Sequence, residues 1–232
     1  MSNGRIPGID GDQWAKGLNV PGWLWNAPQN QGDGGVKGCL ILAHGAGAPM
    51  DSAFMEEMAQ RLAGQGLGVL RFEFPYMAQR RSGGGKRPPN PQAVLLDCWR
   101  EVYAGVRPLV AGPLAIGGKS MGGRMASLLA DELGADALVC LGYPFYAAGK
   151  PEKPRVAHLA QLQARTLIVQ GERDALGNRE TVEGYELSPA IELCWLQAAD
   201  HDLKPLKASG FTHADHLRTT AERVAGFVLQ TP

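Results

Sequence analysis

The amino-acid sequence predicts an α/β fold, with a doubly wound, mostly parallel sheet and helices on both faces. Two observations support this. Short segments of strand length alternate with segments of helical periodicity along most of the 232 residues. The strand segments are apolar throughout instead of alternating, which is typical of parallel strands that are buried on both faces. Right-handed crossovers then arrange such strand–helix units as a doubly wound sheet.

Each element is predicted from its length, composition and flanking turns. Six segments have the apolar character of buried strands: residues 39–43, 69–74, 113–117, 137–141, 166–169 and 191–196. Five segments have apolar residues at helical spacing: residues 52–64, 92–110, 121–133, 179–186 and 214–229. Turns rich in glycine and proline separate them, so the order is that of repeated β–α units.

The whole chain, residues 1–232, is expected to form a single domain, because a sequence of this length with 44% hydrophobic residues can bury one core. Residues 1–37 are expected to supply edge strands and a linker. Segments around Val20 and at 23–25 are candidates for one or two antiparallel edge strands. Residues 32–38 have the composition of a hairpin or linker turn.

Charge and hydropathy narrow the classes of partner. Lysine plus arginine and aspartate plus glutamate both number 23, so no net field attracts nucleic acid or an anionic membrane. Residues 1–22 lack the apolar segment of a signal peptide, and no stretch approaches the roughly 20 apolar residues of a membrane-spanning helix. We therefore expect a cytoplasmic protein without nucleic-acid or membrane partners. The oligomeric state stays open.

No metal site or cofactor is predicted. Four cysteines lie within apolar runs without C-x-x-C spacing and are expected to be reduced, buried thiols: Cys39, Cys98, Cys140 and Cys194. His213 and His216, with Asp215 between them, suggest either a metal site or a solvated helix start. The sequence places no third ligand beside the two histidines, which favours the helix start.

A G-x-S-x-G pentapeptide at residues 118–122 lies directly between a predicted strand and a predicted helix. This context is typical of a nucleophile elbow, in which Gly118 and Gly122 remove Cβ atoms that would collide with the crossing strand and helix. Ser120 would be the exposed nucleophile. The alternative is a glycine-rich turn whose serine caps the following helix.

Two further residues follow predicted strands and complete a triad with Ser120. Asp174 comes after the strand at 166–169, and His201 after the strand at 191–196. In a parallel sheet these strand ends share one edge. His201 would act as general base and acid, and Asp174 would orient its ring. Asp200 and Asp202 are alternative acids, although side chains adjacent in an extended turn point apart.

The chain resembles the α/β-hydrolase superfamily, and more narrowly its small dienelactone-hydrolase-like serine hydrolases. The order Ser, Asp, His supports this, and the likeness covers nearly all of residues 36–229. Four segments are also similar to a branch with testis-expressed and chromatin-complex-subunit homologues: residues 42–48, 71–76, 117–123 and 200–202. The resemblance implies an oxyanion hole formed by the backbone N–H groups of Ala46 and Met121.

Two departures from the resemblance matter. Dienelactone hydrolases proper use a cysteine nucleophile, whereas this chain has Ser120. Residues 142–153 are also too few to hold the cap domain that many relatives insert, so an α/β-hydrolase fold without a cap is expected.

The sequence therefore predicts an enzyme, a carboxylesterase-like serine hydrolase that cleaves an ester, thioester or related acyl bond through an acyl-enzyme. Its partner would be a small-molecule acyl substrate of undetermined identity. The alternatives are an acyltransferase, or a non-enzymatic interaction protein that retains the hydrolase scaffold.

Two more features of the sequence lead to hypotheses about substrate binding: the segment 75–91 and Glu73. Residues 75–91 are predicted to be a long loop, either solvated and mobile or a flap that favours anionic acyl substrates through its basic side chains: Arg80, Arg81, Lys86 and Arg87. Glu73 lies between two phenylalanines, where an unpaired carboxylate is costly to bury. We expect it to pair with Arg71 or a loop residue, or to contact the substrate.

Overall fold

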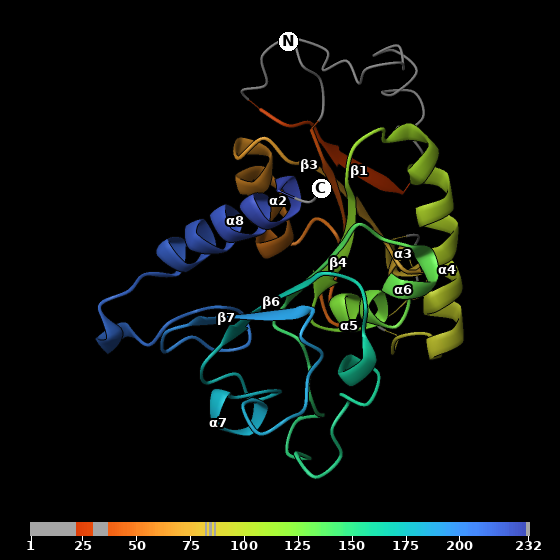
Figure 1. Cartoon of the computed structure of the whole chain (residues 1–232). Helices are drawn as coiled ribbons and strands as arrows, with labels where there is room; N and C mark the ends of the chain where they lie inside the picture. The colour runs from red at the N-terminus through yellow and green to blue at the C-terminus, as the bar shows by residue number, and fades with distance from the viewer. Residues whose placement is uncertain (1–21, 30–36, 82, 84, 86, 231–232) are drawn as a thin grey trace.

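A computed structural model describes residues 22–29, 37–81, 83, 85 and 87–230. One seven-stranded sheet forms its centre, with the strand order β1-β3-β2-β4-β5-β6-β7 (Figure 1). All strand pairs are parallel except β1 with β3. The strands are β1 (Trp23–Asn26), β2 (Cys39–Ala43), β3 (Gly68–Phe72), β4 (Leu114–Lys119), β5 (Ala137–Leu141), β6 (Thr166–Gly171) and β7 (Ile191–Leu196). The predicted mostly parallel sheet is confirmed.

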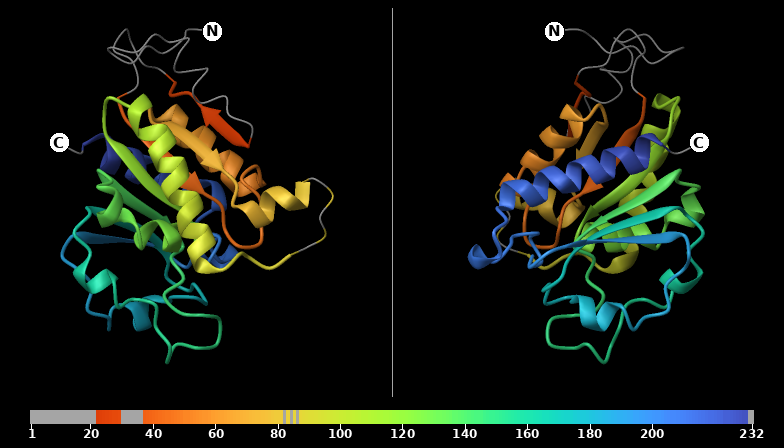
Figure 2. Two further views of the ribbon diagram at one scale, coloured as in Figure 1. Left: turned by 90° about the vertical axis from the view of Figure 1, so that its right-hand side faces the viewer. Right: turned by 60° about the vertical axis from the view of Figure 1, so that its left-hand side comes forward.

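Helices cover both faces of this sheet. In the two views of Figure 2, α4 crosses one face, and α2 and α8 lie together on the other. The α-helices are α2 (Ala53–Gly64), α3 (Pro75–Arg81), α4 (Gln92–Val106), α5 (Met121–Ser127), α6 (Ala130–Leu133), α7 (Arg179–Val182) and α8 (His213–Leu229). Short 3₁₀ helices span Arg107–Leu109, Leu159–Gln161 and Lys207–Ser209. No helix of the described residues is long and apolar enough to cross a membrane.

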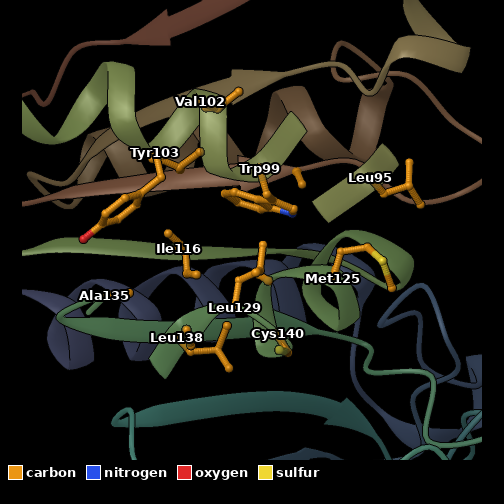
Figure 3. Packing of buried hydrophobic residues seen from close by; sticks show 14 of the residues in the cluster. Leu95, Trp99, Val102, Tyr103, Ile116, Met125, Leu129, Ala135, Leu138 and Cys140 are labelled. Carbon is orange, nitrogen blue, oxygen red and sulfur yellow. The ribbon is translucent and has the colours of Figure 1, made fainter. Parts of the chain in front are cut away.

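The continuous apolar character of the strands has a direct cause in this layered arrangement. Along β2, Cys39 and Ile41 point into the core beneath α4 and α5, whereas Leu40 and Leu42 point into the core beneath α2 and α8. Figure 3 shows the first core from close by, with side chains of α4 facing those of β4, β5 and α5. Successive strand residues are thus buried on opposite faces, as parallel sheets require.

The expectation of an irregular loop from residue 75 onward is wrong at its start, where α3 forms. Pro75 opens the helix, since its fixed φ suits the first turn and its missing N–H costs nothing there. Tyr76 and Met77 are buried, and Arg81 pairs with two carboxylates. Tertiary contacts therefore order a segment whose glycine, proline and basic composition predicts a loop.

Three predicted helices are also shorter or interrupted, and the one expected at 179–186 ends at Val182. The helix expected at 121–133 breaks into α5 and α6, because the N–H groups of Leu128 and Leu129 bond to carbonyls three residues earlier. The helix expected at 92–110 ends at Val106, and a 3₁₀ turn containing Pro108 follows.

The N-terminal edge of the sheet is β1, which pairs antiparallel with β3. The candidate strand around Val20 and most of the turn at 32–38 lie outside the described residues. Between β5 and β6, the described residues 142–165 form turns and one 3₁₀ helix, with no inserted cap domain. The carboxyl ends of β4, β6 and β7 are therefore left uncovered by such an insertion.

Candidate active site

Ser120 occupies the tight turn between β4 and α5. Its φ of 52° lies in the left-handed region that residues with a Cβ rarely adopt. A Cβ on Gly118 would lie 2.6 Å from the carbonyl oxygen of Ala43, and a Cβ on Gly122 would lie equally close to the same atom. Glycine at both positions therefore lets α5 approach β2, the arrangement expected for a nucleophile elbow.

The side chains of Ser120, His201 and Asp174 form one hydrogen-bonded chain. Ser120 has no capping bond from its hydroxyl to α5, and its Oγ lies 2.9 Å from Nε2 of His201. Nδ1 of His201 lies 2.8 Å from Oδ2 of Asp174. An ionised carboxylate only accepts hydrogen bonds, so Nδ1 carries a proton and Nε2 is left to accept the hydroxyl proton. The sheet thus brings together three residues that are far apart in sequence.

Asp174 is held from several sides, although it is fully buried. The backbone N–H of Leu176 donates to Oδ1 at 2.8 Å, and the Gln170 amide donates to Oδ2 at 2.9 Å. Gln170 is itself fixed by the backbone of Tyr143 and Gly177. The sequence reasoning did not identify Gln170. The sequence feature that could have identified Gln170 is an amide near the end of an otherwise apolar strand, four residues before Asp174.

Asp200 and Asp202, the alternative acids of the triad, have hydrogen-bond or ion-pair partners other than the His201 ring. The Asp200 carboxylate accepts from the backbone N–H groups of Asp202 and Lys204 and so stabilises the turn that carries His201. The Asp202 side chain is 73% exposed and pairs with the Lys119 ammonium at 3.3 Å. Asp174 is therefore the carboxylate that contacts the His201 ring.

Lys119, directly before Ser120, is a second residue that sequence reasoning missed. Its buried ammonium donates to the backbone carbonyl of His201 at 2.7 Å and lies 5.7 Å from the ring centre of Phe54. Burial lowers the pKa of Lys119, and the nearby Asp202 carboxylate partly opposes this effect. The lysine thus links the turn before Ser120 to the turn that carries His201.

The geometry of Ala46 and Met121 fits the oxyanion hole that the resemblance implies. Among the described residues, neither backbone N–H has a hydrogen-bond acceptor. The Ser120 carbonyl accepts from Arg124 N inside α5, so the N–H of the same trans peptide, that of Met121, points out of the helix. The Gly45 carbonyl accepts from Nδ1 of His44 at 2.7 Å, which likewise turns the Ala46 N–H away.

His44 is a buried structural support for this turn. Its Nε2 accepts from the backbone N–H of Phe74 at 3.1 Å, and Tyr76 donates to the Ala46 carbonyl at 2.9 Å. Burial lowers the pKa of His44, so its neutral form is favoured. The neutral ring with its proton on Nδ1 satisfies both of its hydrogen bonds.

Two cavities meet at Ser120. The first, here called the Arg124 cavity, has a volume of about 440 Å³ and includes Met121, Arg124 and Arg155 in its lining. The second, the His201 cavity, has a volume of about 340 Å³ and includes Lys119 and His201. Ser120 and Ala46 line both. The nucleophile candidate is therefore accessible from two sides, with room for the two parts of a cleavable molecule.

The described basic side chains of residues 75–91 contact other parts of the protein and do not face the two cavities. The Arg81 guanidinium contacts Glu73 at 2.7 Å and Asp51 at 2.6 Å, and Arg80 donates to the Arg87 carbonyl. None of these side chains lines either cavity, whereas Pro89 and Asn90 from the same segment line the Arg124 cavity. Lys86 lies outside the described residues. Arg81 is thus the loop-side partner expected for Glu73, and Arg71 pairs with Glu56 instead.

The other histidines bond to the protein itself. His213 donates to the Asp202 carbonyl and His216 to the Leu203 carbonyl. His158 contacts the Ser127 hydroxyl at 2.9 Å, but neither residue lines the two cavities. Within the described ranges, no group of three or more His, Cys, Asp or Glu side chains is arranged to hold a metal ion. All four cysteines are free thiols; Cys39 and Cys140 are buried, and the other two are only partly buried.

Comparisons with known proteins agree with this architecture. A lidless α/β serine hydrolase from Xanthomonas campestris superposes with a TM-score of 0.67 at 19% identity, covering 93% of this chain and 94% of that one. A dienelactone hydrolase from Anabaena variabilis gives a TM-score of 0.65 at 18% identity, covering 90% and 91%. Est1E from Butyrivibrio proteoclasticus, solved with ferulic acid, gives 0.64 at 17% identity, covering 90% and 94%.

A search of curated proteins found no match. At these low identities the solved structures establish the fold alone. The sequence profile that describes an alpha/beta hydrolase domain matches residues 36–229, which is most of the chain. The match begins just before β2 and ends with α8, so it includes every element that contributes to the candidate site. The chain therefore belongs to the alpha/beta hydrolase domain family.

Proposed function

We propose that the protein is a serine hydrolase that cleaves a carboxylic ester, thioester or related acyl bond of a small molecule. The observation that supports this most directly is the hydrogen-bonded chain Ser120–His201–Asp174, with distances of 2.9 and 2.8 Å. A serine hydroxyl is a weak nucleophile at neutral pH, and a neutral imidazole nitrogen within hydrogen-bond reach is the group that activates it. The strained elbow presents that hydroxyl to both cavities.

The reaction follows from the positions of these groups. Nε2 of His201 takes the Ser120 proton as Oγ bonds to the substrate carbonyl carbon, and Asp174 stabilises the imidazolium that forms. The N–H groups of Ala46 and Met121 bind the oxyanion. As the tetrahedral intermediate collapses, the bond to the leaving group breaks and His201 returns the proton to it. Water, deprotonated by His201, then attacks the acyl-enzyme and releases the acid and Ser120.

The leaving group and the acyl part have different expected places. His201 protonates the leaving group, and His201 lines only one of the two cavities. The leaving group therefore occupies the His201 cavity. The acyl part occupies the Arg124 cavity, beside the Met121 N–H.

Covalent labelling by a fluorophosphonate probe tests this proposal. We expect labelling of the wild-type protein at Ser120 and hydrolysis of short p-nitrophenyl esters, with both lost in Ser120→Ala. Ser127→Ala is the matched control, because Ser127 also contacts a histidine but lines neither cavity. A folded wild-type protein that takes no label would contradict the proposal and favour a non-enzymatic scaffold. Labelling with transfer of the acyl group to an added alcohol or amine in preference to water would indicate an acyltransferase.

A further inference from the structure

The Arg124 cavity contains two cationic side chains and no acidic one. Arg124 comes from α5, four residues after Ser120, and Arg155 comes from the segment between β5 and β6. No aspartate or glutamate is among the residues that line this cavity. Across the described part of the chain, neither arginine forms an ion pair, whereas several other arginines contact a carboxylate directly: Arg61, Arg71, Arg81, Arg100, Arg107, Arg179, Arg218 and Arg223.

Arg124 is left incompletely satisfied by the protein. Its Nε is buried without a hydrogen-bond acceptor among the described residues. Its Nη2 donates to the neutral side-chain oxygen of Gln92 at 3.3 Å, a long contact. Burial, together with the nearby Arg155 cation, lowers the pKa of Arg124. A partly desolvated guanidinium beside a second one is costly unless an anion accompanies it.

The rest of the cavity limits what that anion is attached to. Apolar side chains line the space around Ser120 and the two arginines: Leu95, Met121, Met125, Pro144 and Leu176. This combination suits an aliphatic or aromatic segment with an anionic end. Arginine binds a carboxylate well, because its planar fork matches the two oxygens.

We infer that the substrate is an ester or thioester whose acyl part carries a carboxylate, bound by Arg124 and Arg155. This inference rests on the proposed hydrolase function, and it names the substrate class of that same site. The bond to be cleaved lies at Ser120, the apolar segment lies against Met121 and Met125, and the free carboxylate lies between the two guanidinium groups. The hydrolysis product is then a dicarboxylic acid.

A matched pair of esters tests the inference. The p-nitrophenyl monoester of adipic acid and p-nitrophenyl hexanoate have acyl chains of equal length and differ in the terminal carboxylate. We expect a higher kcat/KM for the adipate ester after subtraction of its spontaneous hydrolysis. Arg124→Gln and Arg155→Gln should each lower kcat/KM for the adipate ester by about 10- to 100-fold more than for the hexanoate ester, the range for one charge-assisted hydrogen bond.

Arg218→Gln is the charge-matched control, since Arg218 is exposed on α8 and lines neither cavity. It should alter neither ester. If Arg124→Gln does not fold, Arg155→Gln still tests the inference. The Arg155 side chain has no hydrogen-bond or ion-pair partner among the described residues, so its replacement removes no such contact within the protein. Protection of wild-type Ser120 from the fluorophosphonate by adipate, but not by hexanoate, is a second expected result.

Failure of the inference differs from failure of the proposed function. Equal turnover of both esters, unchanged by the two substitutions, would overturn the carboxylate site while Ser120 still reacts with the fluorophosphonate. A protein that neither reacts with the probe nor hydrolyses any ester would instead overturn the hydrolase proposal on which the inference rests.

Discussion

The ammonium of Lys119 donates a hydrogen bond to the backbone carbonyl of His201 at 2.7 Å. Lys119 immediately precedes the proposed nucleophile, and His201 is the proposed base, so one side chain joins the two turns whose spacing decides proton transfer. Gly142 lies against the same contact: a Cβ there would lie 2.9 Å from the His201 carbonyl oxygen and 3.3 Å from Nζ. The buried Lys119 therefore fixes the position of the His201 turn relative to Ser120, and it is not a member of the hydrogen-bonded chain Ser120–His201–Asp174.

Replacing Lys119 by methionine should lower kcat by about 10- to 100-fold with little change in KM, because a small displacement of the base is costly to the chemical step. Steady-state kinetics on a neutral p-nitrophenyl ester measures the two parameters separately. Lys204→Met, an exposed lysine in the same turn, is the control. A raised KM with unchanged kcat would instead place Lys119 in substrate binding.

Asp174→Asn should lower kcat by about 10³- to 10⁴-fold, because an amide cannot stabilise the imidazolium and permits the wrong tautomer of His201. Asp202→Asn is the matched control, since Asp202 directly follows His201 in the sequence and its exposed carboxylate contacts only Lys119 among the described side chains. We expect its effect to be within a few-fold. If Asp202→Asn were the inactive variant and Asp174→Asn remained active, the acid of the triad would have to be reassigned.

Gly122→Ala should destabilise the fold by about 1–3 kcal/mol or more, the usual cost of forcing an extra methyl group into a packed interior. Its Cβ would lie 2.6 Å from the carbonyl oxygens of both Ala43 and His44, which are backbone atoms that cannot rotate away. Gly226→Ala on α8 is the opposite case, since its Cβ would meet nothing within 4 Å. That control should gain up to about 1 kcal/mol from helix propensity. Urea unfolding measures both, and equal stability of the two variants would contradict the elbow packing.

Stability should fall as the pH is lowered from 7.5 to 5.5. Burial lowers the pKa of His44 and of His158 below the ordinary value of 6.5, so the unfolded chain binds more protons than the folded one in this window. The free energy of unfolding therefore rises with pH, by at most about 1.4 kcal/mol per pH unit for each group. Urea unfolding of wild type at several pH values gives the slope. His158→Gln should reduce this slope, and a flat profile for the wild type would contradict the burial argument.

Local sequence patterns were sufficient to predict the main strands of the sheet and the edge at which the candidate site lies. The sequence pattern predicted β2, β5 and β7 at their observed bounds. Every residue of β2 and β5 is buried and apolar, whereas β7 is only partly buried and contains Glu192. The G-x-S-x-G turn and the strand-end positions of Asp174 and His201 pointed to one edge of the sheet. The order of units along the chain and the direction of parallel strands determine that edge, and both can be inferred from sequence.

Tertiary contacts determined the features that sequence patterns did not predict: helix α3, the side chains that support the candidate site, and the lining of the cavities. Composition predicted a loop where α3 forms, because the helix is held by contacts that no local window includes: the Tyr76 hydroxyl donates to the Ala46 carbonyl and Arg81 pairs with Asp51, each 30 residues away in the sequence. The supporting roles of Gln170 and Lys119 depend on backbone atoms of Tyr143 and His201, which are 27 and 82 residues away in the chain. Likewise, Arg124 and Arg155 line one cavity only because the sheet brings α5 and the β5–β6 connection together. Residue spacing predicts which groups reach an edge, whereas side-chain partners depend on how the edge is packed.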